Sequence, residues 1–600
     1  MNKIFDKQAE SYFLATTALE GFWDISKPII FLGEWCLRYS RKSFWENLEY
    51  QIIQSPLKIN QEFYNAYCYV SNLYERVLPL LGEKLNFIHG TSHSNRYWRI
   101  VIGPWLFHYI HVLYDRYTSL RVALDQHSNF TTIGLSEDDY ITPSNTLDFI
   151  NLVCDDPYNL QLYTRILSVL GKDFPRKNLK VITSPVLNPG KRKRRKLRKL
   201  LKSFYNTIFK VVQNNSCPIV IKQACFSRFI ELQLFFKTGG KIWQDSNKIE
   251  LPLLPFNQQM RLKLSDLQLK DCEFEKLLID MLFFDIPKSY IEGFLFVSNE
   301  VDRYYPHKPI AIFSAEAWYF EEVFKQWAAA CAEKGTVLFG IQHGANYGSV
   351  ACLPCETHEV TITDVFYSWG WEKTDLVSRV LPLPATRLTG RKVMGANNQK
   401  DGILLATNCM PRYFYRFQNF KNYDNDEYFS WQQRFTAALS SENRSKMRVR
   451  LYIQDYGSDC IQRWKDYYPE VPLENWDIYF LESLENCRLH VSDHLASTFI
   501  DALVANKPTI LFWNPQVFEV RPEAQPYYDE LRYAGILYNT PEAAATAVNF
   551  FYTDVETWWN DPKLQVIRKK FCNIFAKTSP DAVNEWTNKF KTIAREMKID

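Results

Sequence analysis

The chain has 600 residues, which is too long for one hydrophobic core, so two or more domains are expected. Hydrophobic residues make up 46% and charged residues 23%, as in globular proteins, and the net charge of +4 excludes a global basic field that would require nucleic acid. No apolar run approaches the ~18 residues of a membrane-spanning helix, the charged N-terminus is unlike a signal peptide, and the 13 cysteines lack zinc-ligand spacing. We therefore expect a cytoplasmic protein with reduced thiols, without a metal or cofactor, and with peripheral membrane contact at most.

The first part of the chain is predicted to alternate between helices and strands after a stretch of about 80 residues with a helical and mixed pattern. LNFIHG (85–90) predicts a short buried strand, and the capping residues that follow it predict the start of a helix. Further strands are predicted at NFTTIGL, LDFINLV, LKVITSP, CPIVIK, KPIAIFSA, TVLFGIQHG and DVFYSWG. This alternation is typical of a doubly wound parallel sheet.

A second α/β series begins after the polar linker ANNQKDG (396–402). Its predicted strands lie in ILLATN, MRVRLYI, LENCRLHVSD, KPTILFW and AGILYN, and a helical tail follows from about residue 541. Two such series predict the GT-B architecture, an α/β fold in which two Rossmann-like domains face a cleft and ligands bind at the carboxyl ends of the strands. The expected domains are 1–392, 400–560 and 561–600, the last packing back on the first.

Two candidate catalytic residues follow predicted strands of the first half. His343, in Ile341–Gly344, would donate to a phosphate or a leaving phosphoryl oxygen, and Gln342 and Gly344 beside it would contact the donor. Glu316, after KPIAIF, would act as general base on an acceptor hydroxyl. The structural alternatives are a loop histidine bonded to a carbonyl and a glutamate stabilised by a helix dipole.

The second half supplies the expected donor-binding residues. Ser497 and Thr498 lie near a predicted helix start, where hydroxyls and free backbone N–H groups bind phosphate. Arg412 or Arg416 would bind a phosphate or carboxylate in a bidentate manner. An ordinary helix cap and a surface loop are the alternatives. The full set expected on the donor side of this half is Asn408, Arg412, Asp493, His494, Ser497, Thr498 and Asp501, the last facing the ribose.

Two further segments concern the acceptor and the membrane. His89, Ser94, Arg96 and Arg99 are expected to contact the acceptor from the first half. The run Lys191–Lys202 holds nine Lys or Arg in twelve positions, and it indicates an anionic lipid surface, a solvated helix face or an RNA contact. No P-loop, HExxH or GxSxG motif occurs, and no DxD-type pair ends a strand, which argues against ATP hydrolysis and a metal-dependent GT-A transferase.

The motifs also carry a resemblance to a known family. SNRYWRIVIGPWL, IQHGANYG and SDHLASTFIDALVANKPTILFW resemble transferases from bacterial surface-carbohydrate (O-antigen type) gene clusters, over about residues 30–590. The QHG element and the Ser–Thr loop resemble a wider GT-B group, which includes CDP-glycerol glycerophosphotransferases and transferases using CMP-Kdo or CMP-sialic acids. This resemblance implies a cytidine-nucleotide donor. The His-Pro pair of that group is absent, and His494 stands nearby without a proline.

The sequence therefore predicts a metal-independent, inverting glycosyltransferase of surface polysaccharide biosynthesis. It would transfer an ulosonic acid, such as Kdo or a nonulosonate, from its CMP form to a glycan or lipid-linked glycan. Glu316 would be the base, and His343 would stabilise the leaving phosphate or orient the acceptor. The alternatives are a CDP-glycerol-type glycerophosphotransferase with His343 as base, and a non-catalytic nucleotide- or RNA-binding scaffold; no nucleic-acid partner is expected for the enzyme.

Overall fold

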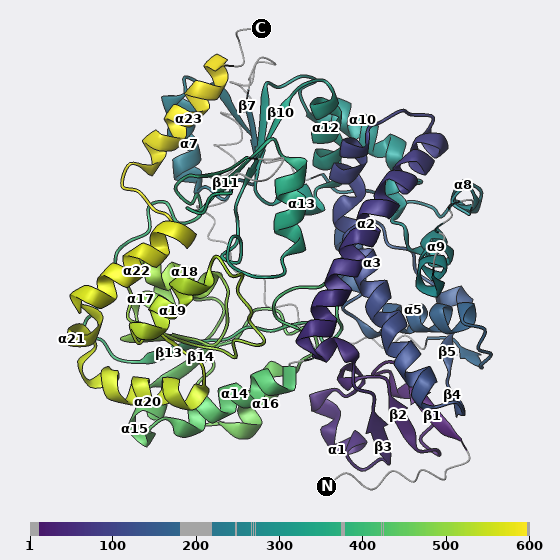
Figure 1. Cartoon of the computed structure of the whole chain (residues 1–600), viewed down its shortest axis with the longest axis horizontal. Helices are drawn as coiled ribbons and strands as arrows, with labels where there is room; N and C mark the ends of the chain where they lie inside the picture. The colour runs from purple at the N-terminus through teal and green to yellow at the C-terminus, as the bar shows by residue number, and fades with distance from the viewer. Residues whose placement is uncertain are drawn as a thin grey trace.

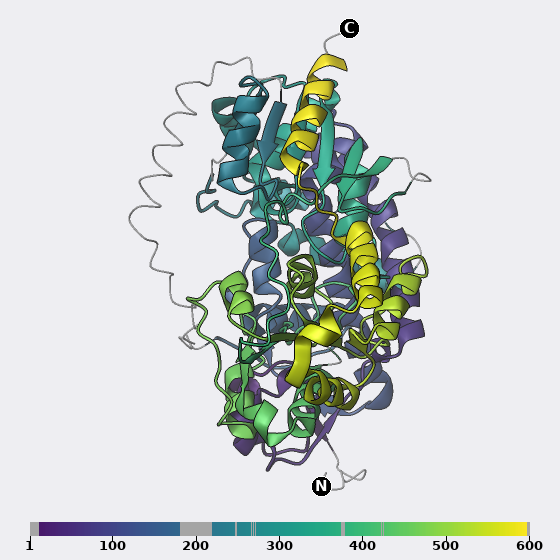
Figure 2. The same cartoon turned by 90° about the vertical axis from the view of Figure 1, so that its left-hand side faces the viewer.

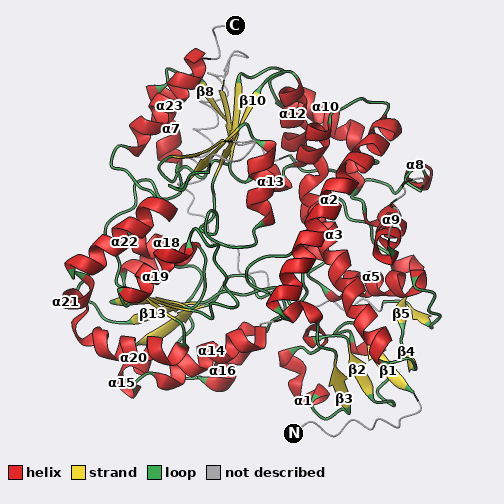
Figure 3. Ribbon diagram, in the orientation of Figure 1, coloured by secondary structure: helices red, strands yellow, loops and turns green. Residues whose placement is uncertain are grey.

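The computed structural model describes residues 11–179, 219–245, 249–265, 267, 269, 272–373, 379–421, 423 and 425–596. In this part of the chain, three parallel sheets of four, six and five strands are joined by a layer of long helices (Figure 1, Figure 3). A short two-stranded sheet, β5 (Gly134–Leu135) with β6 (Arg176–Lys177), completes the strands. The basic run Lys191–Lys202 and most of the predicted strand LKVITSP lie outside the described residues.

The four-stranded sheet near the N-terminus is not predicted by the sequence. It has the order β3-β2-β1-β4 and consists of β1 (Tyr12–Ala15), β2 (Ile29–Phe31), β3 (Tyr50–Ile52) and β4 (Phe130–Thr131), all parallel. The helical and mixed pattern predicted for the first ~80 residues does not reveal these strands, and the long helix of this stretch begins only at Asn60. Strands of two to four residues are too short to show the alternation on which sequence-based assignment depends.

Two long helices, α2 (Asn60–His89) and α3 (Asn95–Gln126), form the helical layer. The predicted strand at 85–90 is wrong, because these residues form the last turns of α2. Leu78, Leu81, Leu85 and Ile88 are all buried at helical spacing, and Gly90 ends the helix with a φ of 66°. The predicted helix start after it is confirmed, since the Ser94 side chain accepts from the Tyr97 N–H.

Shorter helices pack around α3. The predicted strand LDFINLV is also wrong, because it forms α4 (Thr146–Leu152), which Asn145 caps by accepting from the Asp148 N–H. The other helices of this layer are α5 (Asp156–Val169), α8 (Gln258–Leu262), α9 (Glu273–Asp285) and α10 (Phe294–Tyr304). NFTTIGL, predicted as one strand, is split into β4 and β5.

The six-stranded sheet follows the predicted strands closely. Its order is β12-β11-β10-β9-β7-β8, and all its pairs are parallel. The strands are β7 (Ile219–Lys222), β8 (Ile242–Asp245), β9 (Ala311–Ser314), β10 (Val337–Ile341), β11 (Val365–Ser368) and β12 (Arg379–Pro382). Helices α7 (Arg228–Lys237), α11 (Ala317–Phe320), α12 (Glu322–Glu333) and α13 (Pro354–Ile362) connect them. Four predicted strands are confirmed here, those in CPIVIK, KPIAIFSA, TVLFG and DVFYS.

The five-stranded sheet contains every strand predicted for the second half. Its order is β14-β13-β15-β16-β17, from β13 (Ile403–Ala406), β14 (Met447–Arg450), β15 (Leu489–Ser492), β16 (Thr509–Phe512) and β17 (Leu537–Tyr538). Its helices are α14 (Asn425–Ala438), α15 (Ser441–Ser445), α16 (Cys460–Tyr467), α17 (Phe480–Glu485), α18 (Ser497–Val504), α19 (Gln525–Tyr533) and α20 (Pro541–Phe551). The five-stranded sheet places its strands in the order second, first, third, fourth, fifth, and the six-stranded sheet follows the same order with a sixth strand at the end.

The C-terminal helices connect the two halves, as Figure 2 shows for the yellow segments. After α21 (Val555–Trp559), α22 (Pro562–Phe575) packs on α18 and α19 of the second half, and α23 (Ala582–Glu596) packs on the six-stranded sheet. The Phe590 ring lies 4.9 Å from that of Phe313 on β9. Two doubly wound parallel sheets with a helical C-terminus are the predicted GT-B fold, which is confirmed; the domain boundaries 1–392, 400–560 and 561–600 stay a proposal.

Candidate active site

The carboxyl edges of the two large sheets face each other. Arg521, after β16, lies 3.0 Å from the Glu356 carboxylate and donates to the Val350 carbonyl in the segment after β10. Arg387, after β12, donates to Asp501 on α18 at 2.8 Å. In sheets of this order, ligands bind where the winding reverses, between the first and third strands. Those points are β7 and β9 in the first half, and β13 and β15 in the second.

Glu316 and Cys225 meet at the switch point of the first half. The loop after β7 holds Gln223 at φ 47° and Cys225 at φ 63°, in a region that costs free energy for residues with a Cβ. The Cys225 thiol donates to Glu316 Oε1 at 3.6 Å, and this is the carboxylate's one hydrogen bond to the described residues. Glu316 is exposed at the end of β9, so its carboxylate is accessible to an acceptor hydroxyl.

His343, at the end of β10, is held by a buried carboxylate. Its Nε2 lies 3.1 Å from Glu359 Oε1 on α13, and the Tyr347 hydroxyl donates to the same oxygen at 2.8 Å. Glu359 is fully buried, and its other oxygen has no partner among the described residues. The Nδ1 atom of His343 makes no hydrogen bond within this part of the chain, and the side chain is 25% exposed. A histidine fixed through one nitrogen with the other accessible can transfer a proton or bind an anion.

The pKa of His343 is raised above its usual value. Burial opposes the charged imidazolium, but the Glu359 carboxylate beside it outweighs that effect. We expect Glu359→Gln to lower this pKa, because the amide keeps the shape but removes the negative charge. The pH at which the His343 Cε1–H signal titrates in NMR should therefore fall, and the corresponding limb of the kcat profile should move to lower pH. Glu372→Gln, which removes a carboxylate at an exposed position, is the control. An unchanged His343 titration in Glu359→Gln would refute the pairing of His343 with Glu359.

Arg416 lies in the loop after β13, and its Nε donates to Gln418 at 2.9 Å. Its positive charge acts on Tyr347 and on His343, where it opposes the effect of Glu359 and lowers the pKa. Within the described ranges, its two terminal nitrogens have no acceptor at hydrogen-bond distance. A guanidinium held through Nε with its terminal N–H groups available is suited to bind a phosphate or carboxylate.

At the switch point of the second half, a chain of hydrogen bonds leads to the start of α18. Asp493 accepts from Tyr428 and Gln432, both at 2.8 Å, and its Oδ1 lies 2.8 Å from His494 Nδ1. The Nε2 atom of His494 lies 3.1 Å from the Thr498 hydroxyl. No side chain caps α18, so Ser497 and the first backbone N–H groups are available to an anion. Asn408 lies at the end of β13, half-buried.

The structure places several of the predicted donor residues in internal contacts. Gln342 is buried and accepts from the Trp369 N–H and the Trp371 indole, while its amide donates to Gly344, so it holds the His343 loop in place. Gly344 has no positive φ, whereas Gly348, at φ 71° against the Trp371 ring, is the glycine this loop requires. Asp493 and His494 are buried and use their polar atoms within the hydrogen-bond chain.

Two further residues form internal ion pairs instead of facing a donor. Arg412 is bonded to Asp156 and to the Trp35 carbonyl, and so joins the second half to the N-terminal region. Asp501 is buried between Arg387, at 2.8 Å, and Arg391, at 3.2 Å. The carboxylate–guanidinium contacts of Arg412 and Asp501 connect segments of the fold, and the ribose contact of Asp501 stays a prediction.

The four predicted acceptor residues are also engaged in structural contacts, at the opposite edge of the sheet. Arg96 pairs with Asp364, just before β11, and Arg99 pairs with Glu75 on α2. Ser94 caps α3, and His89 Nε2 lies 2.9 Å from the Tyr290 carbonyl with its ring stacked on Phe294. Residues that precede a parallel strand lie at its amino edge, away from His343 and Glu316, so these contacts do not support the acceptor role, which stays a prediction.

Sequence reasoning missed Glu359 and Cys225 and left Arg416 as an alternative to Arg412. Glu359 had one signal in the sequence. It shares a helical face with Cys355 and Ile362, at spacings of four and three, and a carboxylate on a buried face requires a partner. Among the described residues, no group of three or more His, Cys, Asp or Glu could hold a metal ion, and no helix is long and apolar enough to cross a membrane.

Several solved structures are similar to this chain in their overall fold. A Listeria monocytogenes protein assigned as a UDP-N-acetylglucosamine 2-epimerase is 11% identical, with a TM-score of 0.36 over 63% of this chain and 96% of that one. A UDP-forming trehalose-phosphate synthase from Burkholderia vietnamiensis is 8% identical, with a TM-score of 0.33 over 64% and 97%. MurG from Acinetobacter baumannii is 10% identical, with a TM-score of 0.30 over 62% and 99%. No residue role is transferred from them.

The family assignment rests on sequence. No curated protein matches the chain significantly. A family model described as LIC12162 family transferase matches residues 12–590, which is nearly the whole chain. The predicted transferase class is thereby confirmed, and the chain belongs to the LIC12162 family of transferases.

Proposed function

We propose that this transferase moves a glycosyl group from a CMP-linked donor to a hydroxyl of a glycan, in the synthesis of a bacterial surface polysaccharide. The observation that carries the proposal is the pairing of His343 with Glu359 in the loop at the carboxyl end of β10. Arg416, in the loop after β13 of the other half, has terminal N–H groups without an acceptor among the described residues, and its charge acts on His343. The proposal is that both groups contact one anion. The phosphate of a CMP-ulosonic acid, or its sugar carboxylate, has the charge and shape that such a pair binds.

The proposed reaction is a single displacement. The uncapped start of α18, Ser497 and Arg416 hold the donor phosphate, and protonated His343 stabilises the charge that develops on it as CMP leaves. Glu316 takes the proton of the acceptor hydroxyl as the acceptor oxygen forms its bond to the anomeric carbon. The bond from that carbon to the phosphate oxygen breaks, its electron pair departs with CMP, and the configuration inverts. All charge stabilisation comes from fixed protein groups, so no metal is needed.

One observation favours a second function, a CDP-glycerol-type glycerophosphotransferase. A histidine paired with a buried carboxylate is also the arrangement of a general base, and here His343 would deprotonate the hydroxyl that attacks phosphorus. Incubation with CMP-Kdo, CMP-sialic acid, CDP-glycerol and UDP-N-acetylglucosamine in EDTA separates these functions. We expect release of CMP from a CMP-ulosonic acid. Turnover of CDP-glycerol alone would replace the proposal, and restoration of lost activity by Mn²⁺ or Mg²⁺ would refute metal independence.

The alternative that the protein is a non-catalytic nucleotide- or RNA-binding scaffold is tested with the same protein sample. If none of the donors turns over and CMP does not raise Tm, while RNA binds in a salt-sensitive manner, the scaffold replaces the enzyme.

Ser497→Ala is expected to weaken CMP binding about tenfold. A hydrogen bond to a charged group contributes about 1.5–3 kcal/mol, and the hydroxyl lies at the uncapped start of α18. Isothermal titration with CMP measures the loss, and Ser497→Thr, which keeps a hydroxyl, should retain most of the affinity. Equal affinity in the alanine variant and the wild type would remove Ser497 from the donor site.

We also propose that the protein is cytoplasmic and contacts the anionic inner face of the membrane through Lys191–Lys202, where a lipid-linked acceptor would be found. Replacing Lys191 to Lys196 with neutral residues should weaken co-sedimentation with anionic liposomes, more strongly at low salt because the attraction is screened. Turnover of a water-soluble acceptor should be unchanged. Equal co-sedimentation of both proteins would leave this run as a solvated surface.

A further inference from the structure

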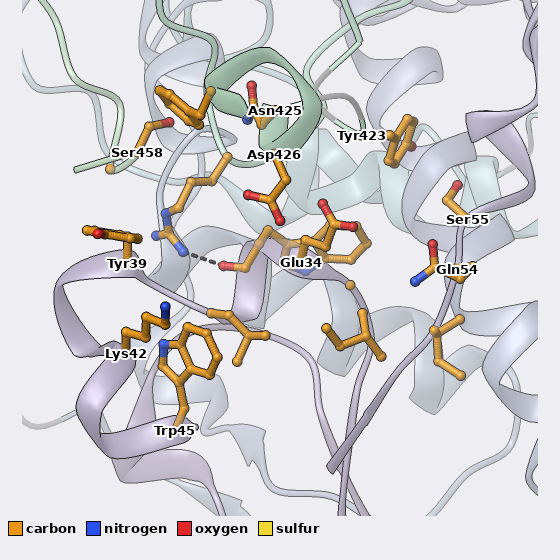
Figure 4. A pocket seen from close by; sticks show the side chains of 18 of the residues that line it. Glu34, Tyr39, Lys42, Trp45, Gln54, Ser55, Tyr423, Asn425, Asp426 and Ser458 are labelled. Atoms are coloured by element: carbon orange, nitrogen blue, oxygen red, sulfur yellow. Dashed lines mark hydrogen bonds between the residues drawn. The ribbon is translucent and has the colours of Figure 1, made fainter. Parts of the chain in front are cut away.

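A cavity of about 340 Å³ lies between the N-terminal region and the second half (Figure 4). One wall comes from residues 33–58, which follow β2 and include β3, and the other from residues 412–467, which follow β13 and include α14 and α16. Of all the residues that the sequence predicts for the donor or acceptor, only Arg412 lines it. The cavity is therefore separate from His343, Glu316 and the start of α18.

The two walls are held together by direct contacts, so the cavity does not depend on a ligand to form. The Arg463 guanidinium lies between the rings of Tyr39 and Phe429, 4.3 Å from each centroid, and these rings come from opposite walls. Asp459 accepts from the Ser40 N–H at 2.9 Å, and Arg412 donates to the Trp35 carbonyl. A preformed cavity of this volume is within the range of small-molecule sites.

The charges that line the cavity largely compensate one another. Four basic side chains are present, Lys42, Lys58, Arg412 and Arg463. Three of them pair with carboxylates: Lys58 with Glu34 at 3.8 Å, Arg463 with Asp426 at 3.7 Å, and Arg412 with Asp156. This balance does not suit a nucleoside diphosphate, which requires uncompensated positive charge. It suits a neutral polar ligand.

The remaining lining groups are those that recognise a sugar. Aromatic side chains from both walls line the cavity, with Tyr39 and Trp45 on one side in Figure 4 and Tyr423 on the other. Gln54 and Asn425 also line it, and their side-chain amides make no hydrogen bond to any residue in the described ranges. Aromatic faces pack on the C–H faces of pyranose rings, while amides donate to and accept from hydroxyls.

We propose that this cavity binds a neutral sugar unit of the glycan acceptor, at a distance from the hydroxyl that reacts. The assignment to the acceptor rests on the proposed function, whereas binding of a neutral glycan does not. The cavity would then select the acceptor chain by a sugar that takes no part in the bond changes.

The test is binding of the full-length protein to an array of bacterial polysaccharide fragments. We expect the wild type to bind one or more neutral glycans, Trp45→Ala and Asn425→Ala to lose about tenfold in affinity for them, and His307→Ala, at an exposed position before β9, to bind as the wild type does. Trp45→Phe, which keeps an aromatic ring, should retain most of the binding.

Stabilisation by CMP is measured on every variant, so that correct folding and the donor site are monitored separately. Absence of any neutral-glycan binding by the wild type, or unchanged binding in Trp45→Ala and Asn425→Ala, would overturn the proposal. If CMP binds and the glycans do not, the acceptor cavity fails and the proposed donor site stands. If the glycans bind and CMP does not, the proposed donor site fails and the neutral-glycan cavity stands.

Discussion

His343→Ala is expected to lower kcat by about 10²-fold or more and to weaken CMP binding to a smaller extent. The side chain lies in the loop after β10, is 25% exposed, and is held by Glu359 at 3.1 Å, so its imidazole is oriented before the substrate binds. Proton transfer by a positioned group contributes roughly 10²–10⁴-fold to rate. Stopped-flow or steady-state measurement of CMP release gives kcat, and a thermal-shift assay confirms that the variant is folded.

His307→Ala is the matched control for this variant. His307 is exposed and precedes β9, so it lies at the amino edge of the same sheet, and its loss should leave kcat unchanged. Wild-type turnover in a folded His343→Ala protein would show that the chemistry takes place elsewhere. A large loss of CMP affinity with unchanged kcat would instead assign His343 to binding alone.

Arg416→Ala should weaken CMP-donor binding more than any other single change, by about a hundredfold. The guanidinium is half-buried, is fixed through Nε to Gln418, and its charge acts on His343 from the other half of the molecule. Two hydrogen bonds from its terminal nitrogens to one anion would each contribute about 1.5–3 kcal/mol. Isothermal titration measures the loss, and Arg416→Lys should recover only part of it, because an ammonium cannot form the bidentate contact.

Arg434→Ala serves as the control for charge removal. Arg434 lies on α14 in an exposed pair with Glu542, so its loss should change donor affinity little. Comparison of CMP with cytidine then locates the contact. If Arg416 binds the phosphate, its replacement lowers affinity for CMP and leaves affinity for cytidine unchanged. Equal effects on both ligands would mean that Arg416 supports the loop after β13 instead of binding phosphate.

The sequence predicts the two large sheets well because their strands are continuous apolar runs between polar loops. Leu489–Ser492 and Thr509–Phe512 are buried at every position, as expected for central parallel strands. The N-terminal sheet escapes prediction because β2 and β3 have three residues each. LNFIHG is misassigned because a six-residue window does not include Leu78 and Leu81, which establish the helical period.

Part of the candidate site is predicted because some of its residues directly follow strands that the sequence shows clearly. His343 and Glu316 follow apolar strands directly, so their place at a carboxyl edge can be read locally. The partners of His343 cannot be read locally from the sequence. Glu359 comes from a later helix and Arg416 from the other half, so only the folded structure relates them to His343. The acceptor residues were predicted from the supposed strand at 85–90, which forms the end of α2. Once α2 replaces that strand, Arg96 and Arg99 no longer follow a carboxyl end.

The most direct test of the account is a crystal structure of the protein soaked with CMP. The account predicts that the phosphate lies between Arg416 and the first turn of α18, within hydrogen-bond distance of Ser497 and near His343, with the cytidine on the five-stranded sheet. Ser497 belongs to α18 and His343 to the loop after β10, so only a site between the two halves satisfies both contacts. CMP bound in the aromatic cavity beside Trp45, or bound without contact to Arg416 and Ser497, would contradict it.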